Sequence, residues 1–210
     1  MGRGVSMKKI NHIEKLTNNR FLNLYHMDVN DTKGKPFNYY FVSRNDEEHL
    51  KIKTRKLDPE GIVIYAVTKE KQPRLVLIRE YRYPLDDYIY ALPAGLVDKD
   101  ETPGEAAARE MLEETGYSFE EYTGGEAAFR RPFLMGPGFT DEASSAVFGY
   151  VELENCRPER ESSEDIEVIL ADKEMVRQIL SEEKVSLRGA YLMMQYLQMK
   201  EDEFAFLKIT

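Results

Sequence analysis

Three glutamates lie close together in one short segment of the chain. They are Glu110, Glu113 and Glu114, and on an α-helix residues three and four positions apart are neighbours. Like charges at this spacing destabilise an isolated helix by roughly 0.2–0.5 kcal/mol per pair, whereas a hard divalent cation such as Mg²⁺ is attracted to clustered carboxylate oxygens. The glutamates therefore predict a divalent-metal site, and the simpler alternative is the solvated face of an exposed helix.

Local signals predict that these glutamates lie on a helix at 103–115. Thr102 and Glu105 form the pattern of a capping box, and Pro103 fits the first helical position. Gly116 is a residue that ends a helix readily in the left-handed conformation. The segment thus contains both a start and a stop for the helix that would carry the carboxylates.

We expect this helix to have one core face and one acidic face. Successive residues are rotated by about 100°, and one stripe then holds the following less polar residues: Ala108, Met111, Leu112 and Thr115. The glutamates fall roughly opposite. Arg109 precedes Glu113 by one helical turn, so we expect an ion pair between these two side chains. That pairing would leave Glu110 and Glu114 freer to bind a cation.

Composition limits the class of protein. The chain has 210 residues, of which 42 % are hydrophobic and 32 % charged, and these values are typical of one globular domain with room for a small appendage. The formal net charge of −9 argues against nucleic acid as a partner, because its phosphates require Lys and Arg. We expect a cytoplasmic protein, since there is neither a membrane-length apolar run nor a secretory signal and the single Cys156 has no disulfide partner.

The order of predicted elements indicates an α+β or α/β sandwich. Residues 19–44 predict an N-terminal β-hairpin around turn-forming residues. We expect further strands at 61–67, 74–82, 88–95, 127–134 and 144–153, and further helices at 172–182 and 185–199. A boundary near 57–60 separates an N-terminal region, 1–57, from a main domain, 58–210. A hairpin of this size must pack on the main domain or on a partner subunit.

Fixed positions on both sides of the glutamates extend the pattern into a longer motif. Gly95 is followed after five residues by Glu101, and after seven more by REMLEETG at 109–116. This segment resembles the Nudix box of the Nudix hydrolase family. The resemblance implies an α/β/α sandwich with a mixed sheet between helices, and an enzyme that cleaves a nucleoside diphosphate linked to another group with the help of divalent cations.

The resemblance also implies a role for each residue of the box. The implied metal ligands are Glu110, Glu113, Glu114 and the backbone carbonyl of Ala94. Glu113 and Arg109 also match catalytic positions, Glu101 matches an orienting one, and Gly95 and Gly116 are structural positions of the motif. The implied cofactor is Mg²⁺, with Mn²⁺ as a substitute, which would neutralise the leaving phosphate and activate a water for in-line attack on phosphorus.

Similarity to the ADP-ribose pyrophosphatase branch of the family extends beyond the box. It is carried by VLIREYRYP at 76–84, YALPAGLVD at 90–98, MGPGFTDE at 135–142 and EDIEVILADKEM at 164–175. The branch implies hydrolysis of ADP-ribose to AMP and ribose 5-phosphate. Two alternatives stay open, namely the same chemistry on another sugar nucleotide or a dinucleotide, and a catalytically silent domain that senses a nucleotide.

Four residues outside the box match functional positions of this branch. Glu142 matches the base or water-orienting residue, and a solvated loop acid is the alternative. Arg82 and Arg44 match phosphate ligands, which suits the bidentate donors of arginine. Tyr39 matches an aromatic that stacks on adenine, although packing across strands explains it as well. In this branch the N-terminal hairpin completes the partner's adenine site, so the resemblance implies a homodimer through the 1–57 region.

Overall fold

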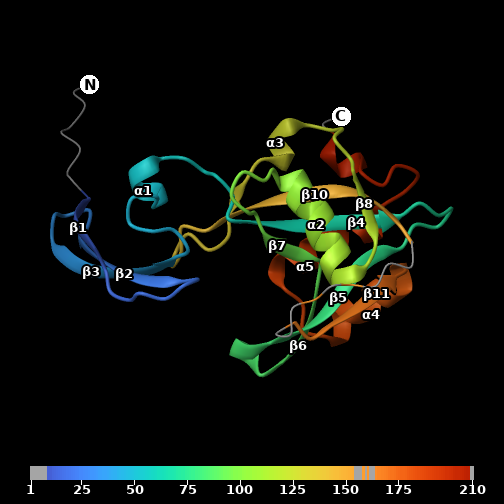
Figure 1. The fold of residues 1–210 in the computed structure, drawn as a ribbon, viewed down its shortest axis with the longest axis horizontal. Helices are drawn as coiled ribbons and strands as arrows, with labels where there is room; N and C mark the ends of the chain where they lie inside the picture. Colours follow the sequence, from blue (N-terminus) through green and yellow to red (C-terminus); the bar gives the residue numbers. More distant parts are fainter. Residues whose placement is uncertain (1–8, 154–157, 159, 161–163, 209–210) are drawn as a thin grey trace. The chain divides into compact units, whose positions relative to one another are not determined.

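The computed structural model describes residues 9–153, 158, 160 and 164–208, and Cys156 lies outside this set. The chain forms two compact units (Figure 1). Unit 1 comprises Met1–Glu60 and Phe133–Ser144, and unit 2 comprises Gly61–Pro132 and Ser145–Thr210. Among the described residues, no helix is both long enough and apolar enough to cross a membrane.

Unit 1 contains a three-stranded antiparallel sheet of order β1-β2-β3. Its strands are β1 (Ile10–Lys15), β2 (Asn23–Asn30) and β3 (Pro36–Ser43). The expected hairpin is confirmed as β2 and β3, with the turn closed by Asp31 and by Gly34 at a φ of 83°, a conformation that glycine adopts without strain. The sequence did not predict β1, which pairs along β2.

A small core and a returning loop complete unit 1. Tyr25, Phe41 and Leu50 are buried together, with Leu50 just before the short helix α1 (Lys51–Thr54). The loop returns from β9 (Phe133–Leu134) and is held to β3, because the backbone N–H of Val42 donates to the carbonyl of Phe139 at 2.8 Å. The Pro-Gly loop that resembles the pyrophosphatase branch therefore folds with the N-terminal sheet.

Unit 2 is built on a mixed sheet of order β11-β5-β4-β10-β8. The strands along this path are β4 (Gly61–Thr68), β5 (Leu75–Arg82), β8 (Ser118–Glu121), β10 (Ala143–Glu152) and β11 (Ile166–Ala171). Two further strands, β6 (Asp87–Ala91) and β7 (Ala94–Leu96), pair antiparallel with β5 and β4. Every residue of β4 is buried, as expected for a strand covered on both faces.

Helices cover both faces of this sheet. They are α2 (Pro103–Thr115), α4 (Lys173–Glu182) and α5 (Leu187–Gln198), and short 3₁₀ turns lie at Tyr83–Leu85 (η1) and Ala205–Leu207 (η2). Alternate residues of β4 face the helices on opposite sides of the sheet. Ile62 and Ile64 pack with α2, which crosses in front of β4 in Figure 1. Val63 and Tyr65 pack with α4 and α5. The expected α/β/α sandwich is confirmed.

Two strand predictions need correction. The segment expected as a strand at 127–134 forms the short helix α3 (Ala127–Arg130) and then the two-residue β9; the helix ends there because Arg131 precedes a proline and is extended. The strand expected at 88–95 is interrupted at Pro93, which cannot donate to a ladder, so that β6 and β7 pair with different strands. The sequence also missed β8.

The ends of α2 follow the sequence, but its buried face does not. Both capping-box hydrogen bonds of Thr102 and Glu105 are present, and Gly116 ends the helix at a φ of 76°. Ala108 is exposed and Leu112 is 45 % exposed, so the predicted core stripe is wrong at these positions. The buried residues are Ala106, Ala107, Met111, Glu114 and Thr115. Apolar periodicity could not reveal that a glutamate occupies the side turned toward the sheet.

Candidate active site

A glycine under α2 lets one of the glutamates approach the sheet. Gly95 lies in β7, and a Cβ added to it would lie 1.9 Å from Cδ of Glu110. Any larger residue at this position would therefore displace the Glu110 side chain. The strand is fixed in turn by its pairing with β4, where Gly95 is opposite Ile62. The glycine of the box thus has a steric role in placing the carboxylate.

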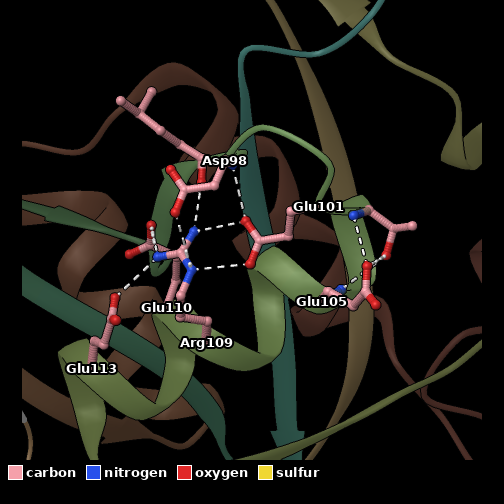
Figure 2. Close-up of polar contacts among 8 residues, drawn as sticks. Asp98, Glu101, Glu105, Arg109, Glu110 and Glu113 are labelled. Atoms are coloured by element: carbon pink, nitrogen blue, oxygen red, sulfur yellow. Dashed lines mark hydrogen bonds and ion pairs between the residues drawn. The ribbon is translucent and has the colours of Figure 1, made fainter.

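Arg109 anchors the helix to the loop that precedes it (Figure 2). Its Nε and Nη2 donate to the two carboxylate oxygens of Glu101 at 3.0 and 2.9 Å, and Nη2 also donates to the carbonyl of Leu96 at 2.9 Å. This two-pronged geometry is the strong form of an arginine–carboxylate contact. Because of it, the pKa of Glu101 lies below its ordinary value.

The remaining nitrogen of Arg109 binds two glutamates of the helix. Nη1 donates to Oε2 of Glu113 at 3.1 Å and to Oε1 of Glu110 at 2.9 Å, as Figure 2 shows. The expected pair with Glu113 is confirmed, but Glu110 is not left freer than Glu113, because the same nitrogen also binds Glu110. The side chain of Glu110 thus lies against Gly95 and within hydrogen-bond distance of Arg109.

Glu114 is the most buried carboxylate of the helix. It is 5 % exposed, and its Oε2 accepts a hydrogen bond from the backbone N–H of Ala94 at 3.3 Å. Burial raises its pKa well above the ordinary value, and the negative charges of Glu110, Glu80 and Glu164 raise it further. Burial likewise raises the pKa of Glu110, against the opposing effect of Arg109. Burial and the neighbouring carboxylates therefore both disfavour the charged form of Glu114.

Two of the acidic residues around Glu114 were not predicted from the sequence. Glu80 lies in β5, where burial raises its pKa and Nη2 of Arg82 binds its Oε2 at 2.7 Å. Glu164 precedes β11, whose first residue Ile166 lies opposite Glu80. The pairing of β5 with β11 is a long-range contact that local patterns do not contain. An available signal was the spacing of Glu80 and Arg82, which places both on one face of a strand.

The other predicted residues lie in unit 1. The hydroxyl of Tyr39 donates to the carbonyl of Gly138 at 2.5 Å, while in β3 the residue lies opposite Met27. Nε of Arg44 contacts Oε1 of Glu142 at 3.4 Å. The structure thus brings Arg44 and Glu142 together and joins Tyr39 to the same loop.

The donor set of the box fits a hard cation. Within the described residues, no three His, Cys, Asp or Glu side chains already stand arranged around a common point as metal ligands would. Oε2 of Glu110 and Oε1 of Glu114 nevertheless lack a hydrogen-bond partner among those residues. Carboxylate and carbonyl oxygens suit Mg²⁺ or Mn²⁺ better than softer metals, and a cation would offset the charge that raises the pKa of Glu114.

The chain also matches known proteins in this region. Residues 58–185 match the family model of the NUDIX domain. The chain belongs to the Nudix family. The match spans β4 to α4 and includes all residues of the box.

Individual relatives cover more of this Nudix protein. It is 32 % identical over 193 residues to an ADP-ribose pyrophosphatase of Bacillus subtilis, which covers 90 % of this chain and 91 % of that protein. It is 28 % identical over 152 residues to an ADP-ribose pyrophosphatase of Saccharomyces cerevisiae, with 71 % and 60 % covered. A crystal structure of an ADP compounds hydrolase has a similar fold, with a TM-score of 0.64 at 19 % identity over 94 % of this chain and 97 % of the other.

The burial of Glu114 predicts a pH-dependent gain in stability when its charge is removed. In the folded, metal-free protein its pKa is raised, so the folded state binds this proton more tightly than the unfolded state and loses stability as the pH rises above the ordinary glutamate value. Glu114→Gln should therefore raise the melting temperature in chelator at about pH 8, with a smaller gain at about pH 5.5.

Glu105→Gln is the matched control on the same helix. Hydrogen bonds from Thr102 lower the pKa of Glu105, so removing this charge should lower the melting temperature or leave it unchanged. Calorimetry of both variants across the pH range makes the comparison. A Glu114→Gln protein whose melting temperature follows that of the wild type at every pH would contradict the description of Glu114 as a buried, uncompensated carboxylate.

Proposed function

We propose that this Nudix protein is a divalent-metal-dependent pyrophosphohydrolase that converts ADP-ribose to AMP and ribose 5-phosphate. One observation carries the proposal: Glu110 and Glu114 converge beside β7 at the positions of the Nudix box, and burial raises the pKa of both carboxylates. The substrate follows from similarity to ADP-ribose pyrophosphatases, one of which aligns with 90 % of the chain.

The residues proposed to hold the metal are Glu110, Glu114, Glu113 and the carbonyl of Ala94. Mg²⁺, or Mn²⁺ in its place, would neutralise charge on the leaving phosphate and lower the pKa of a water that attacks phosphorus. Arg109 contributes by holding Glu110 and Glu113 in fixed directions through one nitrogen. Glu101 contributes by holding Arg109, so the ligands are positioned before the substrate arrives.

Glu142 is proposed to orient the attacking water or take its proton. Nε of Arg44 contacts the carboxylate of Glu142 at 3.4 Å. The backbone N–H of Glu142 donates to the hydroxyl of Thr140 at 3.1 Å, so both the backbone and the side chain of Glu142 are held by neighbouring residues. A second candidate for the same role is Glu164, whose charge acts on both Glu110 and Glu114.

The proposed substrate contacts are Arg82, Arg44 and Tyr39. The Arg82 guanidinium is partly exposed and uses Nη2 for Glu80, which leaves further donors for a phosphate. Arg44 is also partly exposed beside Glu142. Tyr39 lines a small cavity of about 160 Å³ with Phe41, Met27 and other residues of unit 1, and an aromatic side chain suits a planar base.

A homodimer through region 1–57 is part of the proposal, as is a cytoplasmic location. Unit 1 exposes several large apolar side chains, which two subunits would cover on association: Phe21, Leu22, Phe37, Tyr40 and Phe139. Light scattering of the full chain is expected to give twice the mass of one chain. A monomer that retains full activity would contradict the dimer and leave the hydrolase proposal intact.

The function is tested by product analysis after incubation with Mg²⁺ and ADP-ribose. We expect AMP and ribose 5-phosphate from the wild type. Glu114→Gln should lower kcat by about 100-fold or more, because it removes a charged ligand of a group that supplies several kcal/mol of stabilisation. Glu105→Gln, which keeps the capping box, should stay near the wild-type rate.

A panel of other nucleotides separates the alternatives. A clear preference for a different sugar nucleotide or for a dinucleotide would reassign the substrate. Binding without hydrolysis of any compound would favour a nucleotide sensor. Undiminished turnover by Glu114→Gln would contradict the assignment of the metal ligands.

A further inference from the structure

Arg160 connects two segments that each carry an acidic residue of the site. Its Nε donates to the backbone carbonyl of Glu114 at 2.8 Å, and its Nη1 donates to the backbone carbonyl of Ile166 at 2.6 Å. Both bonds end on main-chain oxygens, so one planar guanidinium fixes two backbone positions relative to each other. The Nudix box does not include this arginine, which lies 46 residues after Glu114.

At the first segment, Arg160 completes the C-terminal end of α2. The last carbonyls of a helix lack partners within the helix, and α2 has no basic residue in its own last turn. The carbonyl of Leu112 is bound by the N–H of Gly116, and that of Met111 also accepts from the hydroxyl of Thr115. The carbonyl of Glu114 is bound by Arg160, whose positive charge also suits the negative end of the helix dipole.

At the second segment, Arg160 holds the start of β11. Ile166 lies opposite Glu80 of β5, and Glu164 is two residues before it. The same stretch is held from β5, because the N–H of Tyr81 donates to the carbonyl of Asp165 at 3.1 Å. Arg160 therefore joins the turn of α2 that carries Glu114 to the backbone that carries Glu164, and the charges of these two carboxylates act on each other.

We propose that Arg160 is a positioning residue that sets the separation of Glu114 and Glu164 for a divalent cation. The inference rests on the proposed function only in assigning a cation to the box. The planar fork of arginine matches two acceptors at a fixed spacing, which the single ammonium of lysine does not reproduce. Partners that orient metal ligands without touching the metal typically contribute about 10–100-fold to affinity or activity.

Mn²⁺ binding by the full-length protein without substrate tests the proposal, followed by calorimetry or by the electron paramagnetic resonance of free Mn²⁺. Arg160→Lys keeps the charge and loses the fork, and Arg160→Gln loses both. Positioning predicts weaker Mn²⁺ binding, by about tenfold, in both variants. Arg177→Gln is the matched control, because Arg177 is exposed on α4 and donates to the carbonyl of Lys173; its Mn²⁺ affinity should equal that of the wild type.

A purely electrostatic role gives the opposite pattern. Removing a positive charge near carboxylates would tighten Mn²⁺ binding in Arg160→Gln and leave Arg160→Lys unchanged, and either result would overturn the proposal. Circular dichroism and melting curves accompany each titration. Arg160→Lys retains a cation at the end of α2 and so keeps the measurement informative if Arg160→Gln unfolds.

Steady-state kinetics provide an independent readout. Saturating Mn²⁺ should restore most of the kcat of Arg160→Lys, with the KM for ADP-ribose within about twofold of the wild type. If the wild type binds Mn²⁺ through Glu114 and Arg160→Lys binds it equally well, the positioning role fails and the hydrolase proposal stands. If ADP-ribose is not hydrolysed but Mn²⁺ affinity still depends on Arg160, the substrate assignment fails and the positioning role stands.

Discussion

The burial of carboxylate charge beside β7 is the constraint on which the rest of the site depends. Glu114 is 5 % exposed among other acidic side chains, and taking a charge out of water without an adequate partner is costly. The fold tolerates this arrangement because hydrophobic packing of Ala106, Ala107 and Met111 holds α2 against β4. Burying these carboxylates lowers the stability of the folded protein, but it gathers in one place the oxygen ligands that a divalent cation requires.

Arg109 determines how that charge is arranged. A positively charged side chain in the middle of the acidic cluster would cancel its attraction for a metal ion. Arg109 instead lies at the edge of the cluster, where Glu101 and the carbonyl of Leu96 bind one side of its guanidinium. Only its Nη1 reaches Glu110 and Glu113. Gly95 provides the space for Glu110. The arginine thus orders two of the carboxylates, whereas among the described residues the carboxylate of Glu114 accepts a hydrogen bond from the backbone N–H of Ala94 and none from an arginine.

The sequence predicted what local chemistry decides. The start and end of α2 followed from Thr102, Glu105 and Gly116, because caps act within one turn of the helix. The buried face of α2 was mispredicted, because tertiary packing turned Glu114 rather than Leu112 toward the sheet. The elements that pack against a helix determine which of its faces is buried. Apolar periodicity predicts that face correctly only when no polar functional residue is buried on it.

The parts of the site that depend on distant pairing could not be obtained from local patterns. Glu80 and Glu164 meet because β11 pairs with β5, and Arg160 reaches Glu114 from a segment far along the chain. The motif identified the carboxylates of the helix, but the residues that hold and surround them come from elsewhere in the fold. The family match covers residues 58–185, which include both the box and the distant residues that surround its carboxylates.

Anomalous X-ray diffraction from crystals grown with Mn²⁺ and a nonhydrolysable ADP-ribose analogue would locate the cation relative to α2. We expect a manganese peak within coordination distance of the carboxylates of Glu110 and Glu114, adjacent to the pyrophosphate, and the loss of that peak in Glu114→Gln crystals. Manganese bound only at other residues, or a pyrophosphate bound away from α2, would show that these glutamates do not form the metal site.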